Sequence, residues 1–244
     1  MRGKIPVKMT AGWQSGRVAG VVGATVLLLA CGAPKSVPKA SADSARITAT
    51  AAVDSTPVVL FVGTSLTAGL GLPADEAYPA LIQQKIDSAG LNFRAVNAGV
   101  SGETSAGALR RIDWLLRQPV RVLVLEEGAN DGLRGLDPDS MAANLQEIID
   151  RTRAAHPGVR LVIAGMMAPP NMGARYTTRF ERVFPEIARR NHAALIPFLL
   201  AGVAAVPRLN QSDGMHPTAE GDRIVADNVW KVLRPVLEEV ARKR

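Results

Sequence analysis

From residue 57 to the end of the chain, short apolar runs alternate with longer stretches in which apolar residues recur every three or four positions. The short runs predict five β-strands, at residues 58–62, 93–97, 120–125, 160–165 and 194–198. The longer stretches predict five helices, at residues 78–89, 104–116, 139–154, 177–191 and 217–241. Asp137 and Pro138, directly before the third of these helices, are typical of a helix N-cap and first turn.

A strand followed by a helix, repeated five times, predicts an α/β fold in which a parallel sheet is covered by helices on both faces. Residues 57–244 number 188, a normal size for one such domain. In an open parallel sheet the ligand site lies at the carboxyl ends of the strands. The residues directly after each predicted strand are therefore the first candidates for chemistry.

The first 30 residues follow a different pattern, in which basic residues precede an uncharged run at 18–32. This run has 15 residues and contains three glycines, whereas a membrane-spanning helix needs about 20 predominantly apolar residues. The layout predicts an export signal over residues 1–30. Its end, Leu28-Leu29-Ala30-Cys31, resembles the lipobox of bacterial lipoproteins, in which the cysteine is lipidated and begins the mature chain. The alternative is an ordinary cleaved signal with an incidental thiol.

Residues 31–56 are rich in Ala, Ser, Pro and Thr and show no helical or strand periodicity. They predict a flexible tether between a lipidated Cys31 and the domain at 57–244. Cys31 is the only cysteine in the sequence, which excludes an intrachain disulfide. We therefore expect an exported lipoprotein, anchored to a membrane of the bacterial cell envelope and facing the periplasm or the exterior.

Composition and charge narrow the classes of function. The chain is 47% hydrophobic and 21% charged, which suits a packed core. Its net charge of +7 falls to +3 when the four basic residues of the predicted signal are removed: Arg2, Lys4, Lys8 and Arg17. Because no basic stripe with interleaved aromatic residues is present, we expect no nucleic-acid partner. The three histidines have no second ligand at metal spacing, so we expect no metal site.

Residues suited to nucleophilic catalysis follow the predicted strands. Ser65 lies in a Gly-flanked turn from strand to helix, where a hydroxyl can be exposed. A serine alone is a poor nucleophile, and His216 supplies a base whose imidazole Asp213, three residues earlier, can orient. The backbone N–H groups of Ser65 and Gly99 and the side-chain amide of Asn130 are candidate donors to the oxyanion of a tetrahedral intermediate. This set of residues predicts acyl transfer.

Each of these segments also has a structural interpretation when it is taken alone. Gly63-Thr64-Ser65 is typical of a turn into a helix, and the segments at 97–99 and 130–132 are typical of strand-end turns. His216 can be a neighbour of a helix N-cap, and Asp213 a loop carboxylate. Their shared place at strand-to-helix junctions on one edge of the sheet favours a catalytic site.

The segments at 63–69, 97–102, 128–131 and 213–217 resemble, in this order, the four blocks of the SGNH (GDSL-like) hydrolase superfamily. The likeness extends over residues 58–237 and points to the branch that holds arylesterases and the acyl-CoA thioesterase I/lysophospholipase L1 type. It implies a flavodoxin-like, three-layer α/β/α sandwich without metal or cofactor. It also implies hydrolysis of a small-molecule or lipid ester or thioester through an acyl-enzyme on Ser65. For the oligomeric state we take a monomer as the default.

Three residues depart from the pattern of that superfamily. Thr64 stands where Asp most often precedes the nucleophile, Ala129 where Gly is frequent, and Glu127 where an apolar residue is common in the thioesterase branch. None of them removes a catalytic group. We expect Glu127 to be a solvated carboxylate at a strand end rather than a group that supports the site, because lone charges at such positions are usually exposed.

Two other functions stay open at the level of sequence. One is an O-acetyl esterase that acts on envelope glycans with the same site. The other is a catalytically weak envelope binding module, in view of Thr64 and Glu127. Four methionines near the predicted strand ends are compatible with a soft wall for an acyl chain or with core packing: Met166, Met167, Met172 and Met215.

Overall fold

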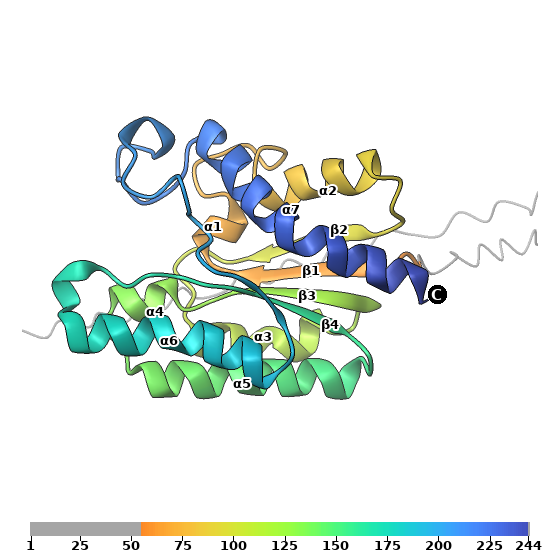
Figure 1. Cartoon of the computed structure of the whole chain (residues 1–244), viewed down its shortest axis with the longest axis horizontal. Coiled ribbons are helices and arrows are strands. Elements are labelled where there is room, and N and C mark those ends of the chain that lie inside the picture. Colours follow the sequence, from red (N-terminus) through yellow and green to blue (C-terminus); the bar gives the residue numbers. More distant parts are fainter. Residues whose placement is uncertain (1–54, 244) are drawn as a thin grey trace, which may run out of the picture. The chain divides into compact units, whose positions relative to one another are not determined.

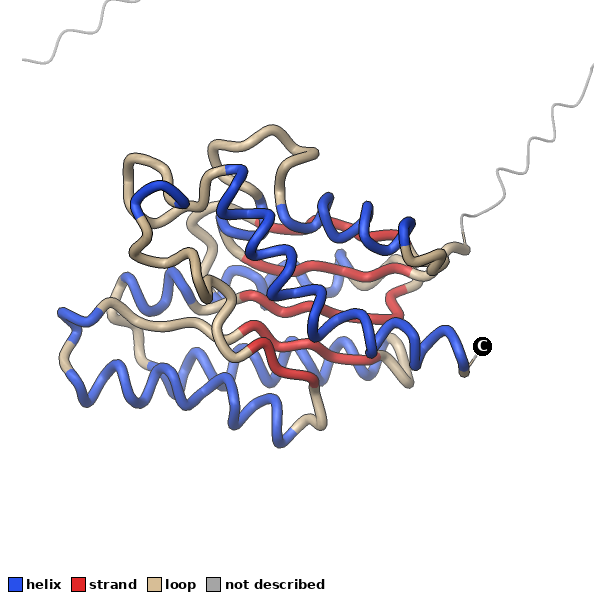
Figure 2. Tube along the Cα trace, turned by 45° about the horizontal axis from the view of Figure 1, so that its top comes forward, coloured by secondary structure: helices blue, strands red, loops and turns tan. Residues whose placement is uncertain are grey.

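Five parallel strands form the centre of the computed structural model, which describes residues 55–243. They are β1 (Val58–Gly63), β2 (Arg94–Gly99), β3 (Val120–Glu126), β4 (Arg160–Ala164) and β5 (Ala194–Ile196). Their order across the sheet is β2-β1-β3-β4-β5 (Figure 2), which is the doubly wound order of flavodoxin-like folds. The five predicted strands are confirmed. β5 is shorter than expected because its pairing with β4 loses register after Ile196: the Ile196 carbonyl oxygen accepts from the Gly165 N–H, but the Gly165 carbonyl oxygen accepts from Leu199 instead of residue 198.

The inner strands of the sheet provide much of the hydrophobic core. Every residue of β1 is buried, and in β3 only Arg121 is exposed. β2 lies at an edge of the sheet and is only half-buried. Since helices cover both faces of a parallel sheet, its inner strands are apolar on both sides. This explains why they stand out in the sequence as continuous apolar runs.

The five predicted helices are also present, in two layers. They are α2 (Tyr78–Ser88), α3 (Ser105–Leu115), α5 (Pro138–Ala155), α6 (Ala174–Arg190) and α7 (Ala219–Arg242). α2 and α7 pack together on one face of the sheet, and α3, α5 and α6 cover the other (Figure 1). The predicted three-layer α/β/α sandwich is therefore confirmed.

Side-chain caps begin two of these helices. The Asp137 carboxylate accepts a hydrogen bond from the Ser140 N–H over 3.2 Å, which confirms the predicted N-cap of α5. α7 begins at Ala219, two residues later than predicted, because Thr218 is its N-cap and accepts from the Gly221 N–H. The chain between Pro217 and Ala219 thus belongs to the cap of α7.

Short helical elements occur in the loops between the main ones. They are α1 (Ser65–Ala68), α4 (Ala129–Leu133) and the 3₁₀ turns η1 (Pro170–Met172) and η2 (Pro207–Leu209). Elements of three to five residues are too short to show a helical period, and the sequence does not predict them. α1 follows β1 directly and α4 follows β3, so both lie at the carboxyl edge of the sheet.

The predicted export signal at 1–30, the lipidation site Cys31 and nearly all of the tether at 31–56 lie outside the described residues. β1 begins at Val58, one residue after the predicted start of the domain. Within residues 55–243, no helix has both the length and the apolar character needed to cross a membrane.

Candidate active site

Ser65, His216 and Asp213 form one hydrogen-bonded chain at the carboxyl edge of the sheet. Ser65 Oγ lies 2.8 Å from His216 Nε2, and His216 Nδ1 lies 2.6 Å from Asp213 Oδ2. A carboxylate can only accept, so the proton between His216 and Asp213 belongs to Nδ1. Nε2 is then free to accept from the serine hydroxyl. The three predicted catalytic residues are thus brought together in the order that general-base activation of a serine requires.

Asp213 is held in a tight turn with the histidine that it orients. Its Oδ1 accepts from the N–H groups of Met215 and His216, at 2.9 and 3.0 Å. The side-chain bond with His216, followed by these two backbone bonds, lowers the pKa of Asp213 well below its ordinary value. Asp213 is therefore an ionised acceptor at any pH at which His216 can serve as a base.

Gln211 ties the loop that carries His216 to the loop that follows the nucleophile. Its side-chain amide donates to the carbonyl oxygens of Leu70, at 2.7 Å, and Pro217, at 2.9 Å. Its backbone N–H donates to the carbonyl oxygen of His216 at 2.7 Å. These three bonds explain how residues 151 positions apart in the chain are held at hydrogen-bond distance.

Ser65 is the first residue of α1, where backbone N–H groups have no partner within the helix. Its own N–H has no acceptor among residues 55–243. Asn97 of β2 anchors this helix, since its side-chain amide donates to the Thr67 carbonyl oxygen at 2.8 Å. The Ser65 N–H is therefore available to a bound oxyanion, as expected.

Gly99 has a different role from the one predicted. Its N–H donates to Asn97 Oδ1 at 2.9 Å, whereas the next N–H, of Val100, donates to Gly63 of β1. The Gly99 N–H therefore points to the open edge of β2 and away from Ser65. A Cβ at Gly99 would lie 2.2 Å from the Ala68 nitrogen. Glycine is needed here because α1 packs directly on the strand, not because it supplies a donor.

Asn130 is presented by α4 beside the turn that precedes α3. Its Nδ2 donates one hydrogen to the Glu103 carbonyl oxygen at 2.9 Å, which leaves the second hydrogen free. The neighbouring Asp131 is buried and accepts from the N–H and the hydroxyl of Ser105, at 2.9 and 2.6 Å. These bonds fix α4 against α3 and hold the Asn130 amide in one orientation.

The prediction that Glu127 is solvated is wrong. The residue is only 2% exposed, and neither of its carboxyl oxygens has a hydrogen-bond partner among residues 55–243. β3 is the middle strand of the sheet, so its end is covered from both sides, unlike the end of an edge strand. Burial is the largest cause that raises the pKa of Glu127, and the nearby charge of Glu126 adds to it. Burial thus favours the neutral form of Glu127.

Glu126, the last residue of β3, is a buried group beneath the nucleophile that the sequence analysis did not single out. It is 1% exposed and accepts hydrogen bonds from Thr64 and Thr67, which flank Ser65 in the chain. Burial raises the pKa of Glu126 to about 7 even though these hydrogen bonds lower it. A carboxylate that ends an otherwise apolar strand was the signal in the sequence that could have identified it.

Exposed apolar side chains gather in the loops at the same edge. Of the seven large apolar residues exposed within the described part of the chain, five lie in these loops and a sixth ends α4 at the same edge. We call these six the apolar rim: Leu70, Val100, Leu133, Leu136, Met167 and Met215. The seventh, Trp114, lies near the end of α3. Met166 is buried in the core instead. Of the four methionines, Met167 and Met215 thus lie in the rim and Met166 in the core, whereas Met172 is half-buried near the start of α6.

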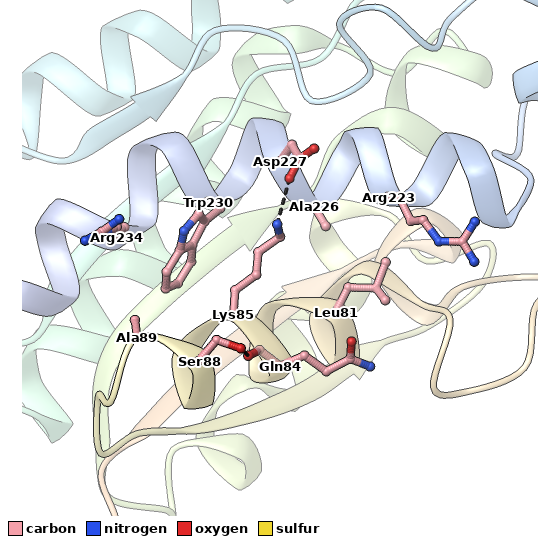
Figure 3. Close-up of a pocket in the computed structure, with 10 residues that line it drawn as sticks. All are labelled: Leu81, Gln84, Lys85, Ser88, Ala89, Arg223, Ala226, Asp227, Trp230 and Arg234. Atoms are coloured by element: carbon pink, nitrogen blue, oxygen red, sulfur yellow. Dashed lines mark hydrogen bonds and ion pairs between the residues drawn. The ribbon is translucent and has the colours of Figure 1, made fainter.

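Two surface hollows flank the domain. The larger, of about 710 Å³, runs between α2 and α7, and the Lys85–Asp227 ion pair crosses it beside Trp230 (Figure 3). It shares no residue with the triad. The smaller, of about 440 Å³, lies at the start of α6. It includes Tyr176, whose hydroxyl donates to the Leu136 carbonyl oxygen of the apolar rim at 2.7 Å.

Among residues 55–243, no group of three or more His, Cys, Asp or Glu side chains is placed to hold a metal ion. A doubly wound sheet with a hydrogen-bonded Ser–His–Asp set at its carboxyl edge is the arrangement of a serine hydrolase that acts by acyl transfer.

Comparison with known proteins agrees with this class. Residues 61–224 match the GDSL-like Lipase/Acylhydrolase family, and the chain belongs to that family. It is 40% identical to the esterase TesA of Pseudomonas aeruginosa over 180 residues, 73% of this chain and 89% of that protein. It is 34% identical to thioesterase 1/protease 1/lysophospholipase L1 of Escherichia coli K12, over 73% of this chain and 84% of that protein.

Solved structures show the same relationship. The crystal structure of TesA aligns with a TM-score of 0.70 and 39% identity, over 73% of this chain and 98% of that one. The similarity therefore includes both the fold and the sequence of the catalytic domain.

Proposed function

We propose that this protein hydrolyses carboxylic esters through an acyl-enzyme on Ser65. The observation that carries the proposal is the chain of hydrogen bonds from Ser65 Oγ through His216 to Asp213, at 2.8 and 2.6 Å. The names of the esterase relatives support the same activity.

In the proposed cycle His216 Nε2 takes the Ser65 hydroxyl proton as the oxygen attacks the acyl carbonyl carbon. The imidazolium, stabilised by Asp213, then gives this proton to the leaving alcohol or thiol as its bond to the acyl carbon breaks. Water, deprotonated by the same histidine, attacks the acyl-enzyme and releases the acid and the free serine. Each proton that His216 accepts is thus returned within the same half-reaction.

Two donors for the oxyanion are the Ser65 N–H and the free hydrogen of Asn130 Nδ2. Since the Gly99 N–H is engaged, we assign the third donor to Gly102. The Gly102 N–H has no acceptor within residues 55–243, and its φ of +77° suits glycine. Gly102 directly precedes Glu103, whose carbonyl oxygen binds the Asn130 amide, so both donors lie at one turn.

The acyl group of the substrate is proposed to be aliphatic and to lie on the apolar rim. Six exposed apolar side chains around one site provide a surface that an acetyl group would not use. Thioesters and lysophospholipids are candidate substrates because the Escherichia coli relative is named for both activities. The alternative O-acetyl esterase would need a polar surface for the glycan. A binding module without turnover would not need the proton-transfer geometry of Ser65 and His216.

Chain-length profiles of p-nitrophenyl esters test this proposal. We expect wild-type protein to hydrolyse the esters and Ser65→Ala to show no turnover above background with an unchanged fold. Leu70→Ser and Leu133→Ser should lower activity on the octanoyl ester more than on the acetyl ester. Trp114→Ser, an exposed apolar residue outside the rim, is the matched control. Acetyl preference with no effect of the rim variants would favour the O-acetyl esterase, and an active Ser65→Ala would refute the mechanism.

We further propose that the protein is exported and anchored through a lipidated Cys31. The support is the basic segment, the uncharged run at 18–32 and the Leu-Leu-Ala-Cys sequence at its end. Metabolic labelling with an alkyne fatty acid in a bacterial host should mark the wild-type protein and not Cys31→Ser. Export of the wild-type protein without labelling would instead indicate an ordinary cleaved signal and no lipid anchor.

A further inference from the structure

Glu126 accepts hydrogen bonds from three donors in the nucleophile loop, which we define as residues 64–67. Its Oε2 accepts from the Thr64 N–H at 2.9 Å and from the Thr67 hydroxyl at 2.8 Å. The Thr64 hydroxyl lies 3.1 Å from both Oε1 and Oε2. Both threonines are buried, at 1% and 0% exposure, so water does not compete for these bonds.

The direction of each bond follows from counting protons. Thr67 has one hydroxyl proton and donates it to Glu126, so in the 2.7 Å contact between Thr67 Oγ1 and Tyr78 the tyrosine is the donor. The result is a chain from Tyr78 through Thr67 to Glu126 in which every proton is used. In this chain Glu126 Oε2 is the acceptor, a role that the ionised and the neutral carboxyl group can both fill.

The backbone of the loop is built around this carboxylate. A Cβ at Gly63 would lie 2.6 Å from Glu126 Oε2 and 2.2 Å from Thr67 Oγ1, so only glycine leaves room for the carboxylate. Thr64 is the N-cap residue of α1, yet its side chain makes no capping bond. Its hydroxyl is directed to Glu126 instead. The residue that departs from the usual Gly-Asp-Ser pattern is thus one of the two threonines that bind this group.

We propose that Glu126 is a positioning residue that, together with Thr64, holds Ser65 Oγ at bonding distance from His216. The proposal rests on the nucleophilic role proposed for Ser65. Ser65 is bonded directly to Thr64, and two of the three donors to Glu126 belong to Thr64. The third belongs to Thr67, two residues after Ser65 in α1. The loop is therefore held on both sides of the nucleophile.

The other ionisable groups around Glu126 are Tyr78 and Glu127, both buried. Burial, with the negative charge of Glu126 as the second cause, raises the pKa of the Tyr78 hydroxyl. Tyr78 therefore remains a donor to Thr67. Glu127 accepts no hydrogen bond from any residue of the described part of the chain, which makes it a matched control for the loss of a buried carboxyl group.

Steady-state kinetics of Glu126→Gln, Thr64→Val, their double variant and Glu127→Gln on a p-nitrophenyl ester test the proposal. We expect Glu126→Gln to lower kcat by about tenfold to a hundredfold with KM nearly unchanged, because misplacing a reacting group by about 1 Å costs about that much. Thr64→Val should act in the same direction. The double variant should be no worse than Glu126→Gln alone, and Glu127→Gln should retain wild-type kcat.

The fold of each variant is compared with wild type by circular dichroism and thermal unfolding, which separates misfolding from misplacement, and the wild type is labelled at Ser65 with a fluorophosphonate. A kcat of Glu126→Gln within twofold of wild type, or a strictly additive double variant, would overturn the inference. If Glu126→Gln does not fold, Thr64→Val and Thr67→Val test the positioning role in its place. A wild-type kcat in both of these variants would overturn the inference. Wild-type protein that is neither active nor labelled would instead refute the proposed function.

Discussion

Asn130 Nδ2 donates a hydrogen bond to the Glu103 carbonyl oxygen over 2.9 Å, and this bond aims the second amide hydrogen of the same nitrogen. A donor held in advance costs no reorganisation when charge develops on the substrate oxygen, and removing one such donor costs a factor of about 10²–10³ in kcat. The bond therefore turns a flexible side chain into part of the proposed oxyanion site.

Asn130→Ala should lower kcat by about a hundredfold or more while KM changes little, since the lost bond forms mainly in the transition state. The measurement is steady-state hydrolysis of a short p-nitrophenyl ester. Asn228→Ala is the control, because Asn228 also uses its amide to bind backbone carbonyl oxygens, those of Leu199 and Ala201, and takes no part in the contacts around Asn130. Equal effects of the two variants would show that Asn130 acts only on stability.

Asp213→Asn should lower kcat by about 10³–10⁴-fold with little change in the thermal unfolding midpoint. An amide at this position favours the imidazole tautomer in which Nε2 carries the proton and can no longer accept from Ser65. The backbone bonds from Met215 and His216 can persist with the Asn side-chain oxygen. A variant with more than about a tenth of wild-type kcat would be incompatible with the proposed orientation of His216.

Glu127→Leu should stabilise the fold at pH 8. Burial raises the pKa of Glu127, so the folded protein holds it neutral while the unfolded chain ionises it above its ordinary value of 4.5. Stability is then lost as the pH rises from that value toward the folded pKa. Chemical denaturation should show a gain of about 1–3 kcal/mol at pH 8, from the removal of an unpaired buried carboxyl group, and a smaller gain at pH 5. An equal or larger gain at pH 5 would contradict the predicted linkage.

Asp222 of α7 should also make the folded protein less stable as the pH rises, independently of Glu127. Burial raises its pKa to about 7, although the 2.8 Å bond from the Tyr78 N–H lowers it. The unfolded-state value is lower, so the free energy of unfolding should fall between about pH 4 and pH 7 and then level off. Asp222→Asn should reduce this slope in urea titrations at pH 5 and pH 8. A variant with the wild-type slope would exclude Asp222 as a contributor.

The strands and main helices are predictable because each has a period or an apolar run long enough to recognise. The triad is predictable because Ser65, Asp213 and His216 stand directly after strands or before a helix. Gly99 was assigned the wrong role because a sequence does not show which way an N–H of an edge strand points. Glu127 was placed in solvent because its burial depends on β3 being the middle strand, which is a property of strand order. Gln211 could not be found at all, since its role depends on two loops 141 residues apart.

β1 begins at Val58, and Ser65 lies just beyond its other end. At the rise per residue of an extended strand, Ser65 is about 20 Å from Val58. α7 runs back along the sheet, and its last turn lies near the start of β1 (Figure 1). Both ends of the described chain are thus on the side of the molecule opposite the triad. A bead, tag or fusion partner attached at either end should leave the catalytic edge open, which makes the domain suited to immobilisation without loss of access for substrate.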